Sequence, residues 1–253
     1  MSRFYSVGKS RNSYQSNSLL PFKISRSKID LFINCPCCFY LDRRLGIAQP
    51  PGYPFSLNSA VDKLLKKEFD IHRANNRIHP LMKSYGIDAV PYANPQIDAW
   101  RDHFRGIRYL HEPTNFDIFG AVDDLWINPY GELHVVDYKS TAKNGEVNLN
   151  ADWQIAYKRQ MEIYQWLFHK NAFKVSPTGY FVYANGTTDR QAFDAKLEFK
   201  VSILDYRGNF DWVEDVLKEI KACLDSDKIP QSNSDCAFCL YRRNAARSES
   251  RSL

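Results

Sequence analysis

Two aspartates and a lysine between positions 116 and 141 are the side chains of this sequence best suited to chemistry. The stretch FDIFGAVDDLWINPYGELHVVDYKST places Asp123 near the end of one apolar segment and Asp137 and Lys139 in the next. Because residues two apart share a face of a strand, Asp137 and Lys139 point the same way and Tyr138 points the other way. A buried carboxylate and ammonium are costly unless they are paired or bound. With a second carboxylate from the neighbouring strand, the natural partner is a hard divalent cation, magnesium or manganese.

The turn between the two segments decides whether the carboxylates can meet. A plain four-residue turn at Asn128–Gly131 would pair Asp123 with Val136, which would put Asp123 and Asp137 on opposite faces of the hairpin. A shared ion therefore requires an odd-length loop, a β-bulge or a strand bend in this hairpin.

Five short motifs occur in an order that resembles a known family. From the start of the chain they are the segment ISRSKIDLFINCPCCFYLDRRLGI, Gly120 with Asp123, the triplet Asp137-Tyr138-Lys139, the pair Gln160 and Tyr164, and the segment PQSNSDCAFCLY. In this order they resemble the PD-(D/E)XK nuclease superfamily, and within it the RecB-like branch, which includes the CRISPR-associated adaptation nucleases and the nuclease domains of helicase–nucleases. The resemblance covers about residues 24–243.

The resemblance implies a role for each site residue. Asp123 and Asp137 would hold Mg²⁺ or Mn²⁺ together with the carbonyl of Tyr138, and Lys139 would orient or help deprotonate the attacking water. Gln160 and Tyr164 lie four apart on one helical face and would support the site and the nucleic-acid backbone.

Asp62 departs from the family pattern. Members commonly carry a histidine on the first long helix, and the matching place here holds Asp62. Asp62 could be a third metal ligand, or it could pair with Lys66 one turn along. Asp124 follows Asp123 directly and must point to the other face, so we expect a solvated or capping carboxylate there.

Two C-x-x-C pairs predict a second metal site. Cys35 and Cys38 near the start, with Cys236 and Cys239 near the end, make a four-cysteine set for zinc or an iron–sulfur cluster. Spacing alone favours zinc, whereas the resemblance favours [4Fe–4S]. Of the two, we expect the [4Fe–4S] cluster, with zinc as the alternative. Cys37 competes with Cys38 as ligand, and Cys223 fits an apolar helical pattern typical of a core thiol.

The remaining pattern predicts the elements that position these residues. Helices are expected at 27–34, 57–74, 97–104, 152–173 and 211–225, and strands at 103–112, 116–127, 132–138, 177–184 and 197–204. This order predicts an α/β fold in which a mixed central sheet with a β-meander core is flanked by helices, in agreement with the restriction-endonuclease-like fold that the resemblance implies. We expect one nuclease-like domain over 21–243, closed by the two cysteine pairs, between flexible tails at 1–20 and 244–253.

Composition narrows the class of protein further. The net charge of +5 is compatible with a polyanionic partner. No apolar run reaches the ~18 residues of a membrane span, and no export signal is evident, which together predict a cytoplasmic, reducing setting.

The resulting hypothesis is a metal-dependent deoxyribonuclease that acts on single strands or free ends of DNA, in repair, recombination or defence. No phosphate-binding glycine loop of a helicase occurs in the chain, so a helicase would be a separate partner. The alternative is a catalytically degenerate nuclease fold that binds nucleic acid or acts as a scaffold, which the loss of the helix histidine motivates.

Overall fold

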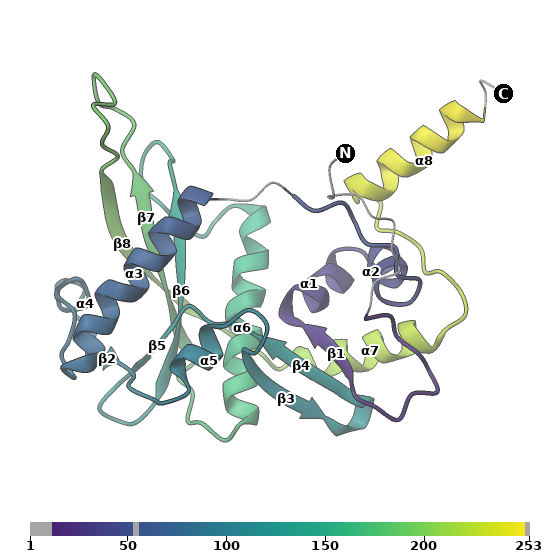
Figure 1. The fold of residues 1–253 in the computed structure, drawn as a ribbon, viewed down its shortest axis with the longest axis horizontal. Coiled ribbons are helices and arrows are strands. Elements are labelled where there is room, and N and C mark those ends of the chain that lie inside the picture. Colours follow the sequence, from purple (N-terminus) through teal and green to yellow (C-terminus); the bar gives the residue numbers. More distant parts are fainter. Residues whose placement is uncertain (1–11, 53–55, 251–253) are drawn as a thin grey trace. The chain divides into compact units, whose positions relative to one another are not determined.

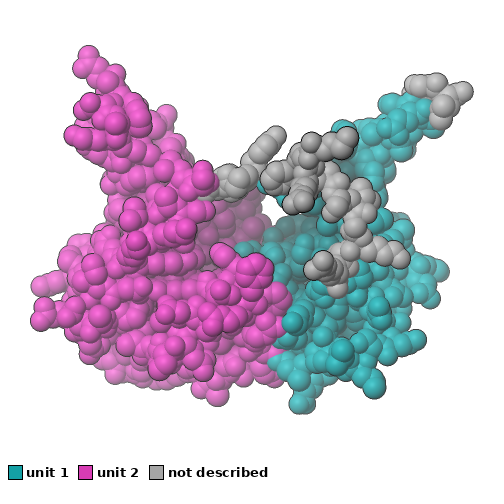
Figure 2. All heavy atoms as spheres, viewed as in Figure 1, with its two compact units in different colours: residues 1–53, 110–118, 211–253 teal, residues 54–109, 119–210 magenta. Residues whose placement is uncertain are grey.

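The computed structural model describes residues 12–52 and 56–250, and the contacts within the chain divide it into two compact units. Unit 1 comprises 1–53, 110–118 and 211–253, and unit 2 comprises 54–109 and 119–210 (Figure 2). Unit 2 contains Asp62, Asp123, Asp137 and Lys139, whereas unit 1 contains the two C-x-x-C pairs. Each unit is described by itself.

Unit 2 is built on a mixed five-stranded sheet of order β2-β5-β6-β7-β8 (Figure 1). The strands β6 and β7 run parallel and the other neighbours run antiparallel. Their bounds are β2 Val90–Pro91, β5 Asp124–Ile127, β6 Leu133–Thr141, β7 Thr178–Gly186 and β8 Phe199–Arg207. The central strand β6 is buried over its first six residues, so side chains on both of its faces lie under helices.

Two long helices cover opposite faces of this sheet. The helix α3 (Ser56–Ala74) contributes Leu65 and Phe69 to a core that includes Val136 and Tyr138 of β6. The helix α6 (Ile155–Lys170) lies on the other face, towards which Asp137 points. The alternation predicted for Asp137, Tyr138 and Lys139 is therefore confirmed. Shorter elements of unit 2 are α4 Pro80–Ser84, α5 Ile97–Arg101 and η2 Asp152–Gln154.

The hairpin between β5 and β6 has the odd-length loop that a shared site requires. Ile127 pairs with Leu133 and Asp124 with Val136. Asn128 N–H donates to the carbonyl of Glu132 at 3.1 Å, and the Asn128 side chain accepts a hydrogen bond from the N–H of Glu132 at 2.9 Å. Three residues, 129–131, thus form the loop. Continued by one residue, this register would set Asp123, which directly precedes β5, opposite Asp137 and on the same face.

The prediction of one strand over 116–127 is wrong. The structure has β4 (Phe116–Gly120) and β5, separated by residues 121–123. Val122 N–H donates to the carbonyl of Trp100 instead of to a strand, and Arg101 Nε donates to the carbonyl of Asp123 at 2.9 Å. These bonds to α5 interrupt the ladder. The strand β4 belongs to a three-stranded sheet of order β1-β4-β3, with β1 Phe22–Ser25 and β3 Ile107–His111.

Unit 1 is mainly helical. Its elements, besides β1, are α1 Arg26–Asn34, α2 Pro36–Arg43, η1 Glu112–Thr114, α7 Val213–Asp225 and α8 Ala237–Glu249. The helices α1 and α2 both contact α7, and α2 contacts α8. Pro36 occupies the first turn of α2, where its missing N–H costs nothing. The sequence analysis assigned neither α2 nor α8.

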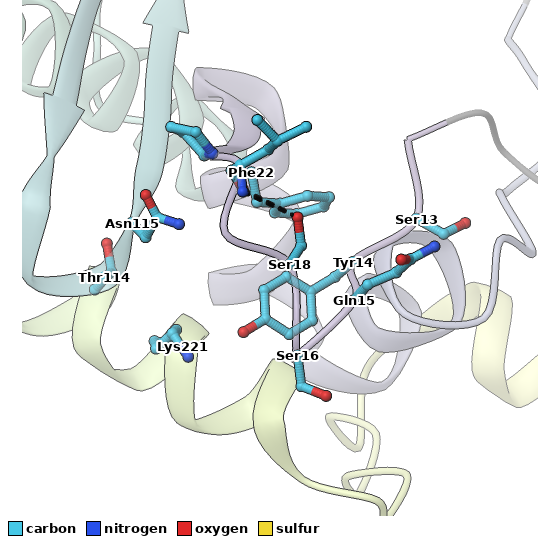
Figure 3. Close-up of a pocket in the computed structure, with 11 residues that line it drawn as sticks. Ser13, Tyr14, Gln15, Ser16, Ser18, Phe22, Thr114, Asn115 and Lys221 are labelled. Atoms are coloured by element: carbon cyan, nitrogen blue, oxygen red, sulfur yellow. Dashed lines mark hydrogen bonds between the residues drawn. The ribbon is translucent and has the colours of Figure 1, made fainter.

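The expected tails at 1–20 and 244–253 overlap the described residues only in part. Residues 1–11 and 251–253 lie outside the described residues. Tyr14 is buried, and its hydroxyl donates to Asp225 Oδ1 at 2.6 Å. Figure 3 shows Tyr14 beside Lys221 at a pocket of about 200 Å³ that Ser13, Ser16 and Ser18 also line. At the other end, α8 continues through Glu249. Among the described helices, none combines the length and apolarity needed to cross a membrane.

Candidate active site and cysteine cluster

Asp137 and Lys139 form the buried centre of the candidate active site in unit 2. Both project from β6, and their side chains form an ion pair in which the Asp137 side chain is only 1% exposed. Gln160 of α6 donates from Nε2 to Asp137 Oδ1 at 2.7 Å. Lys139 Nζ also lies 4.4 Å from the centroid of the Tyr157 ring. These contacts hold the carboxylate and the ammonium in one orientation.

Asp123 reaches the same place from the segment between β4 and β5. Its Oδ2 accepts a hydrogen bond of 2.9 Å from the backbone N–H of Tyr138, the residue between Asp137 and Lys139. The carbonyl of Asp123 is held by Arg101 on α5. The segment is therefore fixed on both sides, and the carboxylate lies beside the strand that carries the other two residues.

A lysine lies between Asp123 and Asp62. Lys66 Nζ is 2.9 Å from Asp62 Oδ2 and 3.1 Å from Asp123 Oδ1. Burial alone would lower the pKa of Lys66, but the charges of Asp123 and Asp62 outweigh burial and raise it. Burial, with the charge of Asp123, raises the pKa of Asp62. Asp62 thus forms the pair with Lys66 that the sequence offered as one alternative, and the pair extends to Asp123.

Lys139 is protonated at neutral pH. Burial would lower its pKa, but the charges of Asp137 and Asp123 outweigh burial, so the pKa lies above the usual value. A lysine with a raised pKa donates hydrogen bonds and carries positive charge.

The other two residues predicted for this site lie on α6 and β6. Tyr164 is buried, one turn after Gln160. Tyr138 directs its side chain to the face of the sheet opposite Asp137, into the core under α3.

Asp124 is not the solvated carboxylate expected from the sequence. It is fully buried and accepts hydrogen bonds from Arg73, from Arg101 at 2.9 Å and from the Tyr138 hydroxyl at 2.7 Å. Two arginines and a phenol replace water, which explains why a charged group is stable there. Neither arginine was predicted to lie here, because the residues near Arg73 and Arg101 in the sequence do not indicate a distant partner. One signal was available in the sequence. Adjacent residues of a strand point to opposite faces, so one of the two aspartates had to share the face of Tyr138 and point into the core.

The four cysteines of the two C-x-x-C pairs converge in unit 1, as predicted. The sulfur atoms of Cys35, Cys38, Cys236 and Cys239 all lie within 4.8 Å of one another. Cys38 Sγ is 3.6 Å from Cys236 Sγ and 3.5 Å from Cys239 Sγ, and Cys35 Sγ is 3.8 Å from Cys239 Sγ.

Cys38, and not the adjacent Cys37, belongs to the group of four neighbouring sulfurs. Cys37 lies outside the four-sulfur group, and its Sγ lies 3.8 Å from Nη2 of Arg242. Burial would raise the pKa of Cys35, but hydrogen bonds from the backbone of Cys38 and Asn233 outweigh it and lower the pKa to about 7. Cys223, expected from its helical pattern to be a core thiol, is only partly buried, and this burial raises its pKa to about 11.

Comparisons with known proteins identify the family of the chain. The sequence pattern of the PD-(D/E)XK nuclease superfamily matches residues 23–244. Among solved structures, the chain is similar to SSO0001, with 17% sequence identity and a TM-score of 0.40, over 90% of this chain and 85% of that one. No curated protein matches significantly. The family pattern spans most of the chain, including the segments with Asp123, Asp137 and Lys139, and on that evidence the chain belongs to the PD-(D/E)XK nuclease superfamily.

Proposed function

We propose that the protein is a metal-dependent deoxyribonuclease that hydrolyses phosphodiester bonds in single strands or at free ends of DNA, in repair, recombination or defence. The observation that carries the proposal is the group formed by Asp123, Asp137 and Lys139 in a chain of this superfamily. Two carboxylates and a protonated lysine at one point of the sheet match the needs of phosphate chemistry.

The donor set fits a hard divalent cation. Asp123 and Asp137 offer carboxylate oxygens, and the carbonyl of Tyr138 lies on the backbone between Asp137 and Lys139. These groups would hold Mg²⁺ or Mn²⁺, with Asp62 as a further candidate ligand. A bound ion of this kind supplies an activated water and positive charge at the phosphate.

The protein side chains have separate tasks in this proposal. Lys139 would orient the attacking water or help to deprotonate it, and its positive charge would offset the charge of the phosphate. Gln160 holds Asp137 in place through its 2.7 Å hydrogen bond. Tyr164, buried one turn further along α6, supports the position of that helix face.

A digestion assay on labelled single-stranded and double-stranded DNA with Mg²⁺ or Mn²⁺ tests the proposal. Asp137→Asn and Lys139→Ala should each abolish cleavage, while DNA binding stays near the wild-type value because binding comes largely from basic groups elsewhere. Asp98→Asn, an exposed aspartate on α5, is the matched control and should cut like the wild type. If the wild type cuts no DNA with either metal but still binds it, the degenerate-fold alternative replaces the nuclease.

For the cysteine cluster we propose one zinc ion rather than the [4Fe–4S] cluster that the resemblance favours. A tetrahedral ion with zinc–sulfur bonds of about 2.3 Å separates its sulfurs by about 3.8 Å. Three of the six sulfur–sulfur separations, at 3.5, 3.6 and 3.8 Å, support this size. A cubane cluster places four irons and four sulfides between its thiolates and needs them farther apart. Zinc here would join the two ends of the chain and stabilise unit 1.

Metal analysis of the purified chain distinguishes the two cofactors. We expect a colourless protein with one equivalent of zinc. Cys38→Ser should lose the metal, whereas Cys37→Ser, a change at the adjacent buried cysteine, should keep it. A brown protein with iron and sulfide after anaerobic purification would overturn the zinc assignment.

A further inference from the structure

A pocket of about 420 Å³ opens beside Lys139 in unit 2. It is bounded by the end of β6, by the loop that follows, and by η2 with the start of α6. Its volume lies within the range of about 300–1,000 Å³ that is typical of ligand sites. Its lining includes Lys139, Lys143, Trp153, Gln154, Tyr157 and Tyr183. The pocket therefore extends the candidate active site outwards from the catalytic lysine.

Aromatic rings lead from Lys139 to the surface of this pocket. The Tyr157 ring, next to Lys139 Nζ, meets the Trp153 ring edge to face, with centroids 5.3 Å apart and planes at 83°. Trp153 is 62% exposed. A tryptophan ring exposed to this degree offers a large flat surface on which a planar ligand can stack.

The charge of the pocket selects the kind of partner. Lys139 and Lys143 line it together with the hydroxyl residues Ser140 and Thr141, and none of its described lining residues is acidic. Cations beside a flat aromatic surface are the combination that proteins use to bind single-stranded nucleic acid, because bases stack on the rings while phosphates meet the cations. A base inside a duplex is already stacked and paired, so it cannot offer its face to Trp153.

The loop of residues 142–151, between β6 and η2, forms one wall of the pocket and is held at both ends by hydrogen bonds. Asn185 on β7 accepts from Lys143 N–H at 2.8 Å and donates to the Lys143 carbonyl at 2.9 Å. Gln154 donates to the Asn148 carbonyl at 2.6 Å and to the Tyr183 hydroxyl at 3.3 Å, and it accepts from Ala151 N–H at 2.9 Å. The wall is thus formed before any ligand arrives, which lowers the entropic cost of binding.

We propose that this pocket binds one unpaired nucleotide of the DNA substrate, with the base stacked on Trp153 and a neighbouring phosphate at Lys143. The inference rests on the proposed nuclease function and deepens it. It makes the protein selective for single-stranded DNA, since only a strand with an exposed base can place a phosphate at Lys139 while filling the pocket.

Binding measured in EDTA, with the full chain and a fluorescein-labelled thymidine oligonucleotide, tests this without requiring cleavage. Trp153→Ala should weaken single-strand binding by about tenfold to a hundredfold, as expected for the loss of a stacked base. Blunt duplex DNA should bind the variant and the wild type equally. Trp153→Phe keeps a ring and should retain most of the affinity.

Tryptophan fluorescence gives a second readout. Three of the five tryptophans, Trp100, Trp126 and Trp166, are at most 4% exposed, so quenching by the oligonucleotide should come from Trp153 and vanish in Trp153→Phe. Trp212→Phe, a change at a partly exposed tryptophan of unit 1, should keep the quenching.

The two proposals fail in different ways. Equal single-strand affinity of Trp153→Ala and the wild type, with both folded by circular dichroism, would overturn the nucleotide pocket even if the wild type cleaves DNA. A selective loss of single-strand binding in Trp153→Ala would support the pocket even if the wild type cut nothing, in which case only the catalytic proposal fails.

Discussion

The backbone N–H of Tyr138 donates a 2.9 Å hydrogen bond to Asp123 Oδ2, while its phenol donates a 2.7 Å bond to the adjacent Asp124. One residue of β6 therefore fixes two neighbouring carboxylates that point to opposite faces of the sheet. Asp123 is left beside Asp137 in the candidate active site, and Asp124 is left in the core between two arginines. The pair shows how the same side-chain chemistry acquires two roles through burial and partners.

Asp124→Asn should destabilise unit 2 without removing a group from the active site. The change leaves Arg73 and Arg101 with only the partly exposed Asp70 as a charged partner, so we expect a loss of about 3–5 kcal/mol in the free energy of unfolding. Asp70→Asn removes a 43% exposed partner of the same two arginines and should cost about 1 kcal/mol or less. Urea unfolding measures both. Equal losses in the two variants would contradict the core role of Asp124.

Lys66→Met should make the stability of the protein depend more strongly on divalent metal. Without the ammonium, Asp62 and Asp123 repel each other unless a cation lies between them. In EDTA the melting temperature should fall, and saturating Mg²⁺ should raise it by more than it raises that of the wild type. Lys67→Met, at an exposed neighbouring lysine, should behave like the wild type. An equal response of all three proteins to Mg²⁺ would argue against Asp62 and Asp123 as a shared cation site.

The pKa of Lys139 predicts how the stabilisation by its ion pair varies with pH. A pKa raised in the folded state means that protonation favours folding. This contribution is complete below the unfolded pKa of about 10.4 and is lost as the pH rises through the folded pKa. The difference in unfolding free energy between the wild type and Lys139→Met should thus stay constant from about pH 7 to about pH 9 and shrink above about pH 10.4. Urea titrations across this range check it, and a change between pH 7 and 9 would refute the assignment of a protonated lysine.

Gly131 closes the three-residue loop that sets the register of Asp123 against Asp137. Its φ of +74° lies in the left-handed region, and a Cβ there would meet open space. Gly131→Ala should therefore cost about 1–2 kcal/mol through backbone strain alone. Gly131→Asn should cost less, because asparagine tolerates this conformation better. Thermal unfolding compares the two, and an alanine variant as stable as the wild type would show that the loop adopts another conformation.

Periodicity was sufficient to predict most elements of the central sheet and its two long helices. The alternation of Asp137, Tyr138 and Lys139 and the helical face of α3 follow from spacing, because each depends on residues that are near one another in the chain. The four-cysteine site could also be anticipated, since two C-x-x-C pairs have one common chemical use.

The features that the sequence did not predict depend on contacts between residues that are distant in the chain. Asn128–Gly131 is compatible with loops of even or odd length, and only the observed pairing of Asp124 with Val136 decides between them. Arg101 and Trp100 break the strand predicted over 116–127 by binding its backbone from another helix, which no local pattern reveals. The choice of Cys38 over Cys37 likewise depends on how α2 turns each thiol relative to α8.

The order of the segments in unit 1 has a consequence for biosynthesis. This unit is assembled from both ends of the chain and from 110–118, whereas nearly all of unit 2 lies between them in sequence. During translation, residues 54–210 leave the ribosome before α7 and the second cysteine pair exist. Unit 2 can then fold before Cys236 and Cys239 have been synthesised, since domains fold as their residues emerge. Under the proposed metal assignment, a chain truncated before Cys236 would carry every candidate active-site residue and still lack two of the four thiols of the cysteine group.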